Sequence, residues 1–195
     1  MPFESKPMYR TGPSTRAACE APHPGQVLAH ERRAVERVCR RLDEVLGPRG
    51  RRLMYTHMLA ERDLMLRFNN QGVPAWEDRM MRIGWPLAVR YAQRELGIRP
   101  GVEVEDEASV FRELDFVAGL LDAGKHLCGD RFSAVDLTFA ALSASVSVPP
   151  VYSVSLPQPD ALPPQTAELV ERVRHHPAGR YALAMFAEHR RAAIT

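Results

Sequence analysis

The chain has 195 residues, of which 45% are hydrophobic and 26% are charged. This composition is typical of a globular protein with one hydrophobic core, and it excludes the intrinsically disordered class. The 26 Lys and Arg residues are nearly balanced by 24 Asp and Glu residues, so the formal net charge of +2 excludes the overall positive field that a nucleic-acid partner needs. The paired arginines, among them Arg40-Arg41 and Arg51-Arg52, are interpreted as solvated helix faces.

The cysteines, histidines and hydropathy pattern limit the remaining classes. Cys19, Cys39 and Cys128 are odd in number and have no paired spacing, which indicates a reducing compartment, and we expect a cytoplasmic protein. No apolar run reaches the length of about 18 residues that spans a bilayer, so no membrane partner is expected. The 7 histidines form no HExxH motif or ligand quartet, and we predict no metal site.

The first 25 residues hold five prolines and two glycines without a sustained period. We therefore predict an irregular lead-in over residues 1–25 and a helical domain over residues 26–195. From Gln26 apolar residues recur at helical spacing as far as a break at Gly47-Pro48. A second helical pattern follows as far as Asn69, either as a new helix or as the first one kinked at Pro48.

The next pattern runs from Pro74 to Gly97, with a kink expected at Pro86. Its apolar residues fall on one side, and they are Trp76, Met80, Ile83, Leu87 and Tyr91. An acidic group at residues 103–107 then precedes another helical pattern over residues 110–121. Beyond a proline-rich connection, short helices are predicted around residues 169–173 and 181–186. Because no alternating strand is evident, we predict an all-α helical bundle.

The stretch GDRFSAVDLTFAALSA, residues 129–144, carries an N-terminal capping box. Ser133 is placed to cap a helix, and the carboxylate of Asp136 can reach back to the Ser133 amide. Phe132 before the cap and Leu137 inside the helix are expected to form a hydrophobic staple. Since apolar residues then point in all directions around the helix, we predict that it is buried on every side.

These residues resemble the carboxy-terminal helical domain of glutathione S-transferases. The resemblance rests on KHLCGDRFSAVD, residues 125–136, on Leu162-Pro163, and on RHHPAG, residues 174–179. Leu46-Gly47-Pro48 with the following RRLMY is similar to the kinked first helix of some bacterial members. The resemblance covers Gln26 to Arg191. It implies that the capping box serves folding, and that the domain is a helical bundle of this family.

The resemblance also implies a binding site. In the family this domain supplies the apolar half of the site for a hydrophobic electrophile, with glutathione as co-substrate. The residues expected to line it are Arg51, Met54, Tyr55 and Met58, with Arg51 or Arg52 able to meet an anionic group. His57 beside them is interpreted as a packing residue. No catalytic residue is identified, because residues 1–25 stand where complete members carry the thioredoxin-like domain that binds glutathione.

Two other hypotheses stay open at this point. One hypothesis is that the domain is a non-enzymatic interaction module, as similar helical domains are in translation factors and tRNA synthetases. Its partner would be another protein or a second copy of the chain. Alternatively, the chain is a truncated fragment of a transferase. Cys128, close to Lys125, His126 and Arg131, is considered as a redox thiol, against the alternative of a small buried turn residue.

Overall fold

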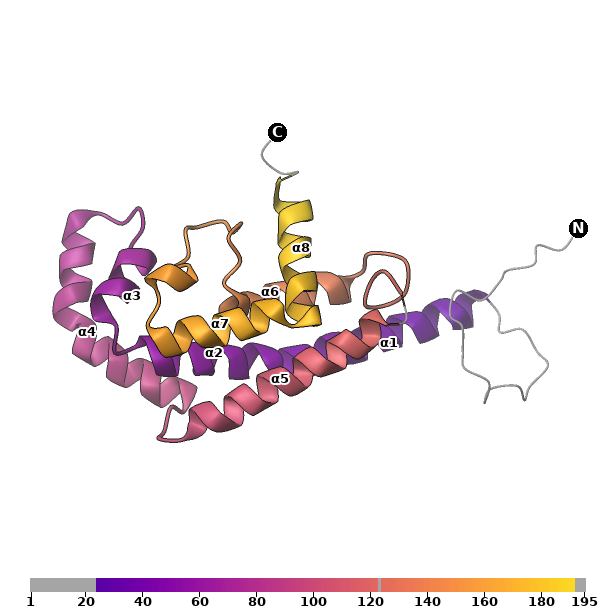
Figure 1. Ribbon diagram of the computed structural model, residues 1–195, viewed down its shortest axis with the longest axis horizontal. Helices are drawn as coiled ribbons and strands as arrows, with labels where there is room; N and C mark the ends of the chain where they lie inside the picture. Colours follow the sequence, from indigo (N-terminus) through magenta and orange to yellow (C-terminus); the bar gives the residue numbers. More distant parts are fainter. Residues whose placement is uncertain (1–23, 123, 192–195) are drawn as a thin grey trace, which may run out of the picture.

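The computed structural model describes residues 24–122 and 124–191. Its helices are α1 (Pro24–Glu44), α2 (Leu46–Met58), α3 (Arg62–Asn69), α4 (Ala75–Leu96), α5 (Val102–Leu121), α6 (Ala134–Ser147), the 3₁₀ helix η1 (Pro159–Ala161), α7 (Pro164–His175) and α8 (Pro177–Arg191) (Figure 1). No strand occurs in these ranges, which confirms the all-α prediction. Most of the predicted lead-in, including Cys19, lies outside the described residues.

The break between α1 and α2 falls at Val45, slightly before the predicted break at Gly47-Pro48. A proline cannot donate to the carbonyl four residues earlier and its ring crowds that carbonyl, which here belongs to Glu44. Pro48 itself therefore sits in the first turn of α2, where a missing amide is tolerated. The second predicted helical pattern is divided as well, because α2 ends at Met58 and α3 begins at Arg62.

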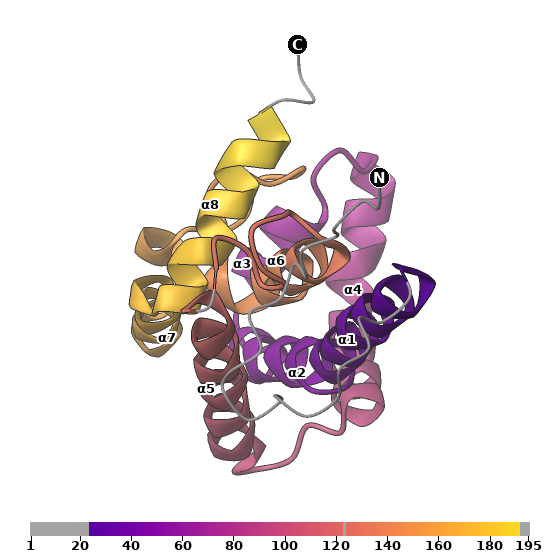
Figure 2. The same ribbon diagram turned by 90° about the vertical axis from the view of Figure 1, so that its right-hand side faces the viewer.

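Helix α6 lies in the middle of the bundle (Figure 2), where it contacts α1, α2, α7 and α8. Its approach to α2 is close because α2 offers glycines on the facing side. A side chain at Gly47 would meet the Leu142 side chain at 3.0 Å, and one at Gly50 would meet the Ser145 hydroxyl at 3.0 Å. The core around this contact consists of aliphatic side chains and one phenylalanine, namely Leu42, Leu46, Leu53, Val110, Leu114, Val117, Val135, Phe139, Val146, Leu169 and Val173.

Helix α5 packs against α2 and begins eight residues earlier than its predicted apolar pattern. The acidic residues at 103–107 are therefore inside the helix, and Asp106 is completely buried. Glu113 on the same helix receives two hydrogen bonds from the Arg41 guanidinium, at 2.8 and 3.0 Å. Arg41 is exposed, as the interpretation of the arginine pairs as solvated helix faces expects, and its guanidinium also joins α1 to α5.

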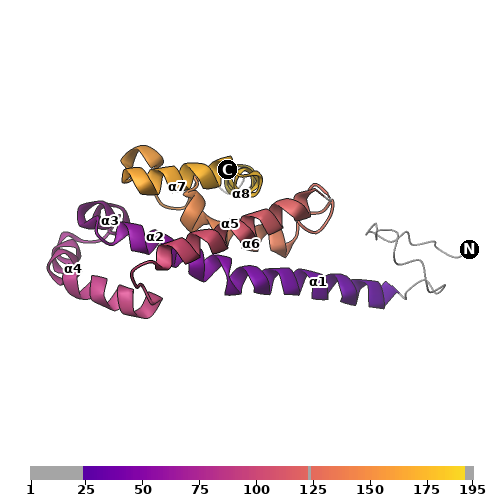
Figure 3. The same ribbon diagram turned by 60° about the horizontal axis from the view of Figure 1, so that its bottom comes forward.

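Helices α3 and α4 form one end of the molecule (Figure 3), and α4 runs through Pro86 without interruption. Pro86 leaves the carbonyl of Arg82 without its helical donor, and the Arg62 side chain donates to that carbonyl at 2.7 Å. The helix bends along its length (Figure 1). None of its residues is buried, so the predicted apolar side of α4 faces outward.

Helices α7 and α8 close the bundle, and both are longer than the short helices predicted around residues 169–173 and 181–186. Between α6 and α7 the chain is irregular apart from η1, as the prolines of this connection predict. None of the helices within the described residues is long and apolar enough to cross a membrane.

Candidate functional site

The capping box predicted at residues 133–136 is present at the start of α6, with both reciprocal contacts made. The Ser133 amide donates to the Asp136 carboxylate at 2.7 Å, and the Ser133 hydroxyl donates to the same oxygen at 2.7 Å. The box does more than cap the helix. The Leu127 amide and the Tyr181 hydroxyl donate to the other carboxylate oxygen, so one side chain joins α6 to the preceding loop and to α8.

The electrostatics of Asp136 follow from this arrangement. The side chain is completely buried. Burial by itself would raise the pKa of Asp136, but the hydrogen bonds from Leu127, Tyr181 and Ser133 together outweigh it and lower the pKa below its usual value. Burial and the bond to Asp136 raise the pKa of the Tyr181 phenol. Asp136 is therefore an ionised structural centre, and it is not available as a proton donor or acceptor for chemistry at neutral pH.

The predicted hydrophobic staple is not a buried contact. Phe132 is 44% exposed and Leu137 is 63% exposed. Both side chains instead line a cavity of about 120 Å³ on the outer side of α6, together with Tyr152, Phe186 and His189. The Phe132 ring lies 4.5 Å from the His189 ring, centroid to centroid. Phe132 therefore has a ring contact with α8 in addition to its place beside the same cavity as Leu137.

The prediction that α6 is buried on every side is also wrong. Leu137 and Ala141, one turn apart, are both exposed. The neighbouring helices cover the rest of α6, but this strip faces the irregular connection between α6 and α7, which does not pack tightly on it. Cavities lie along α6, and their linings bring together most of the residues that the sequence indicates for binding.

We call the first of these the methionine cavity. It has a volume of about 230 Å³, and α2, α3, α6 and the α6–α7 connection form its wall. Met54, Tyr55 and Met58, three of the four predicted lining residues, lie on the α2 side of this wall. Most of the residues that sequence reasoning missed are apolar, and they include Leu64, Met65, Phe68, Val154 and Leu156. Their only sequence signal is the apolar face of α3, because the connection shows no periodicity.

Arg51, the fourth predicted residue, lines a second cavity of about 230 Å³, which we call the arginine cavity. Gly47, Leu142 and Tyr152 line it too. The two cavities adjoin, since both are lined by Ala144, Ser145 and Leu156. Residues 51, 54, 55 and 58 recur every three or four positions, so they occupy one face of α2. His57 is not among the residues that line either cavity.

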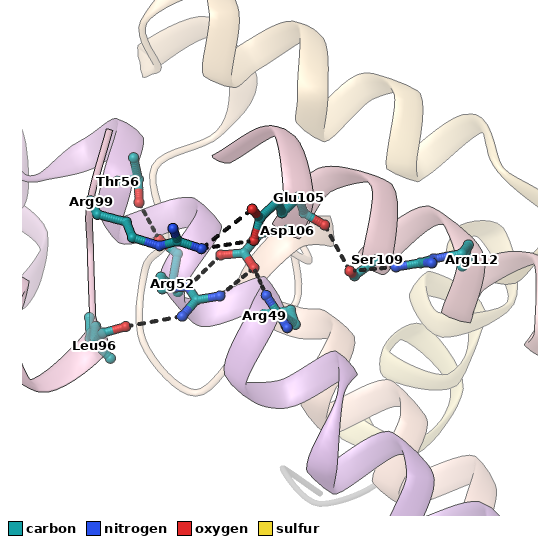
Figure 4. Close-up of polar contacts among 9 residues, drawn as sticks. All are labelled: Arg49, Arg52, Thr56, Leu96, Arg99, Glu105, Asp106, Ser109 and Arg112. Atoms are coloured by element: carbon teal, nitrogen blue, oxygen red, sulfur yellow. Dashed lines mark hydrogen bonds and ion pairs between the residues drawn. The ribbon is translucent and has the colours of Figure 1, made fainter. Parts of the chain in front are cut away.

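Arg52, the alternative anion-binding residue, has another role. Its guanidinium donates two hydrogen bonds to the buried Asp106, at 2.6 and 2.7 Å, and Arg49 donates a third at 2.8 Å (Figure 4). Burial would raise the pKa of Asp106, but the two arginines lower it below the usual range. Arg52 is thus neutralised within the protein, where it ties α2 to α5.

The α6–α7 connection is held over the cavities by Arg174 of α7. This guanidinium donates to the carbonyls of Ser147 and Val148 at the end of α6, and to the side-chain oxygen of Gln158 at 2.7 Å. Val148, which lines the methionine cavity, has φ 45 and ψ 66, a left-handed conformation that β-branched residues rarely adopt. The strain of this turn, of order 1 to 3 kcal/mol, is held in place by Arg174.

The surroundings of Cys128 distinguish the two hypotheses for this residue. Burial is the main cause that raises the pKa of Cys128, so a reactive thiolate is not favoured. Cys128 packs against the main hydrophobic core, as expected of a small turn residue. Among the described residues, no group of three histidine, cysteine or acidic side chains is placed to hold a metal ion.

Comparisons with known proteins found no match to the chain among family models, curated proteins or solved structures. Assignment of a function therefore depends on the residues and the geometry described above.

Proposed function

We propose that this chain is a glutathione S-transferase-like helical domain, and that it binds a small hydrophobic molecule in the methionine cavity. What supports the proposal is one observation. Met54, Tyr55 and Met58, which the family resemblance indicates as substrate-lining residues, border a single cavity whose other lining residues are apolar except for Asn69 and Ser145. In the family the bound molecule is an electrophile and glutathione is the co-substrate. The cytoplasm is the compartment that we propose with this role.

The lining of the cavity suits apolar ligands of different shapes. Its lining includes three methionines, Met54, Met58 and Met65, whose unbranched thioether side chains adapt to different shapes. Tyr55, Asn69 and Ser145 are its polar members, which is the usual pattern of an apolar pocket with a few orienting groups. In the described part of the chain the lining holds no His, Cys, Lys, Arg, Asp or Glu, and its hydroxyl groups are those of Tyr55 and Ser145. The proposal is therefore for binding, with conjugation left to groups outside this cavity.

A fluorescence titration with N-phenyl-1-naphthylamine, an uncharged probe that brightens in apolar surroundings, tests the proposal. We expect saturable binding to the wild-type chain. Leu64→Trp places an indole in the methionine cavity and should weaken binding by at least about tenfold, because the probe and the indole need the same volume.

Val104→Trp is the matched control, because Val104 is 69% exposed on α5 and lines no cavity described above. It should leave the affinity within about twofold of wild type. Equal weakening by both variants, or no probe binding at all, would contradict the proposal. Calorimetry with glutathione on the same samples then separates a transferase from a chain that only binds apolar molecules.

A second candidate function, an interaction module, is favoured by the outer face of α4. Five large apolar side chains on this face, which we call the α4 stripe, are between 60 and 74% exposed, and they are Trp76, Met80, Ile83, Leu87 and Tyr91. They recur every three or four residues along one side of the helix, the spacing of a seam between two helices. Because the same spacing fits an identical helix, we propose a second copy of this chain as the partner.

Sedimentation at several protein concentrations tests this second function. The wild-type chain should sediment as a dimer, and the double variant Ile83→Glu and Leu87→Glu as a monomer, because carboxylates would be buried in the seam. Val104→Glu is the control, since Val104 is 69% exposed on α5 outside the α4 stripe, and it should stay dimeric. A wild-type chain that is monomeric at every concentration would rule out this partner.

A further inference from the structure

The three arginines of α2 differ in what they contact. Arg49 and Arg52 both donate to the carboxylate of Asp106, and neither of them lines one of the two cavities (Figure 4). Arg51 projects from a different side of the helix and is exposed. No hydrogen bond or ion pair joins its guanidinium to any other described residue. Of these three cations, Arg51 is thus the one whose charge is available to a ligand.

Arg51 also supplies the formal charge of the binding region. The lining of the methionine cavity contains no Asp, Glu, Lys or Arg, and that of the arginine cavity contains only Arg51. A molecule that occupies both cavities would therefore meet a long apolar surface and one positive charge, with no carboxylate opposing it. The guanidinium is a donor of several parallel hydrogen bonds, which suits a carboxylate, sulfate or phosphate group.

The shape of the region sets how such a molecule would lie. The cavities share Ala144, Ser145 and Leu156, so a chain of atoms can pass from one to the other along α6. Arg51 is one turn before Met54 and Tyr55 on the same face of α2. A charged head at Arg51 therefore places an attached apolar body against the thioethers of Met54 and Met58.

We propose that the ligand of this region is an amphipathic anion, an elongated apolar molecule with one anionic head. Its head pairs with Arg51 in the arginine cavity, and its body fills the methionine cavity. This inference rests on the proposed function, which gives the apolar body its cavity, and it adds the charge and the orientation of the ligand.

Displacement of N-phenyl-1-naphthylamine by decanoate and by 1-decanol tests the inference. The two competitors have the same ten-carbon chain, and only decanoate is charged at pH 8. Arg51→Gln should lower the affinity for decanoate by about 3 to 10-fold, the range for a solvent-accessible charge-assisted hydrogen bond. The affinities for 1-decanol and for the probe should change by less than about twofold. In wild type, raising the salt concentration should lower the affinity for decanoate and leave the affinity for 1-decanol unchanged.

Arg40→Gln is the matched control, since Arg40 is an exposed arginine of α1 that lines neither cavity. It should leave both competitors unchanged. Probe binding combined with equal responses of decanoate and 1-decanol to Arg51→Gln would overturn the inference and leave the proposed function intact. A wild-type chain that does not bind the probe would overturn the proposed function, and the inference with it.

Discussion

Asp136→Ala is expected to lower the free energy of unfolding by about 3 to 5 kcal/mol. The reason is that the carboxylate is completely buried and receives hydrogen bonds from Leu127, Ser133 and Tyr181. Removal of the carboxylate leaves the buried Leu127 amide and the half-buried Ser133 amide without this acceptor, and it leaves the Tyr181 hydroxyl with His126 of the loop as its partner. Urea denaturation followed by circular dichroism measures the loss.

Asp130→Ala is the control for this variant, because Asp130 is an exposed aspartate in the same loop. Its free energy of unfolding should stay within about 0.5 kcal/mol of wild type. A loss below about 1 kcal/mol in Asp136→Ala would mean that the carboxylate acts only as an ordinary helix cap, for which such values are typical.

The same carboxylate sets part of the pH dependence of stability. Burial opposes ionisation of Asp136, but hydrogen bonds outweigh it and lower its pKa in the folded protein, whereas the unfolded chain keeps a pKa near about 4. The stabilisation is complete above the unfolded pKa and is lost as pH falls through the folded pKa. Between about pH 6 and 3, wild type should therefore lose more stability than Asp136→Ala, while Asp106 contributes to both proteins alike.

Gly179→Ala is expected to destabilise the protein by about 2 to 4 kcal/mol, because there is no room for a side chain where α8 begins. A β-carbon at Gly179 would lie 1.8 Å from the carbonyl oxygen of Val173 and 2.8 Å from its carbonyl carbon. Both contacts are with backbone, so α8 has to shift against α7 before the methyl group fits. Thermal unfolding of the variant measures the effect.

Gly84→Ala is the control, because the same substitution is expected to have the opposite effect on stability at this position. Gly84 lies inside α4, and a β-carbon there would have no atom within 4 Å. Alanine is the better helix former, so this variant should be more stable than wild type by about 0.5 to 1 kcal/mol. Stabilisation of both variants would show that helix propensity, and not the contact with Val173, controls position 179.

The helical architecture could be predicted because it depends on local patterns. Apolar residues at helical spacing indicated most helices, and Ser133 with Asp136 indicated where α6 begins. The predicted first and last residues of the helices were less accurate where they depend on contacts with residues outside the helix. The burial of Asp106 depends on Arg49 and Arg52, which lie more than fifty residues away in the sequence, so the sequence pattern suggested only an acidic lead-in to α5.

The capping box shows the same division within one motif. Its hydrogen bonds join residues three apart, and the sequence predicted them correctly. The predicted staple of Phe132 and Leu137 also joins near neighbours, and both side chains line one cavity, but Phe132 lies against His189 of α8 as well. The local pattern did not indicate this contact with a distant helix, because apolar packing has no fixed direction and takes the partner that the fold offers.

For the candidate site, the sequence by itself determined which residues share a face of α2, since residues 51, 54, 55 and 58 follow the helical period. Only the tertiary structure decided that this face borders two adjoining cavities. It also decided that Arg52 is hydrogen-bonded to Asp106 and that Arg51 is not. The physical reason is that a cavity and an ion pair each need groups from separate elements. Periodicity orients a side chain on its own helix, but only packing brings its partners to it.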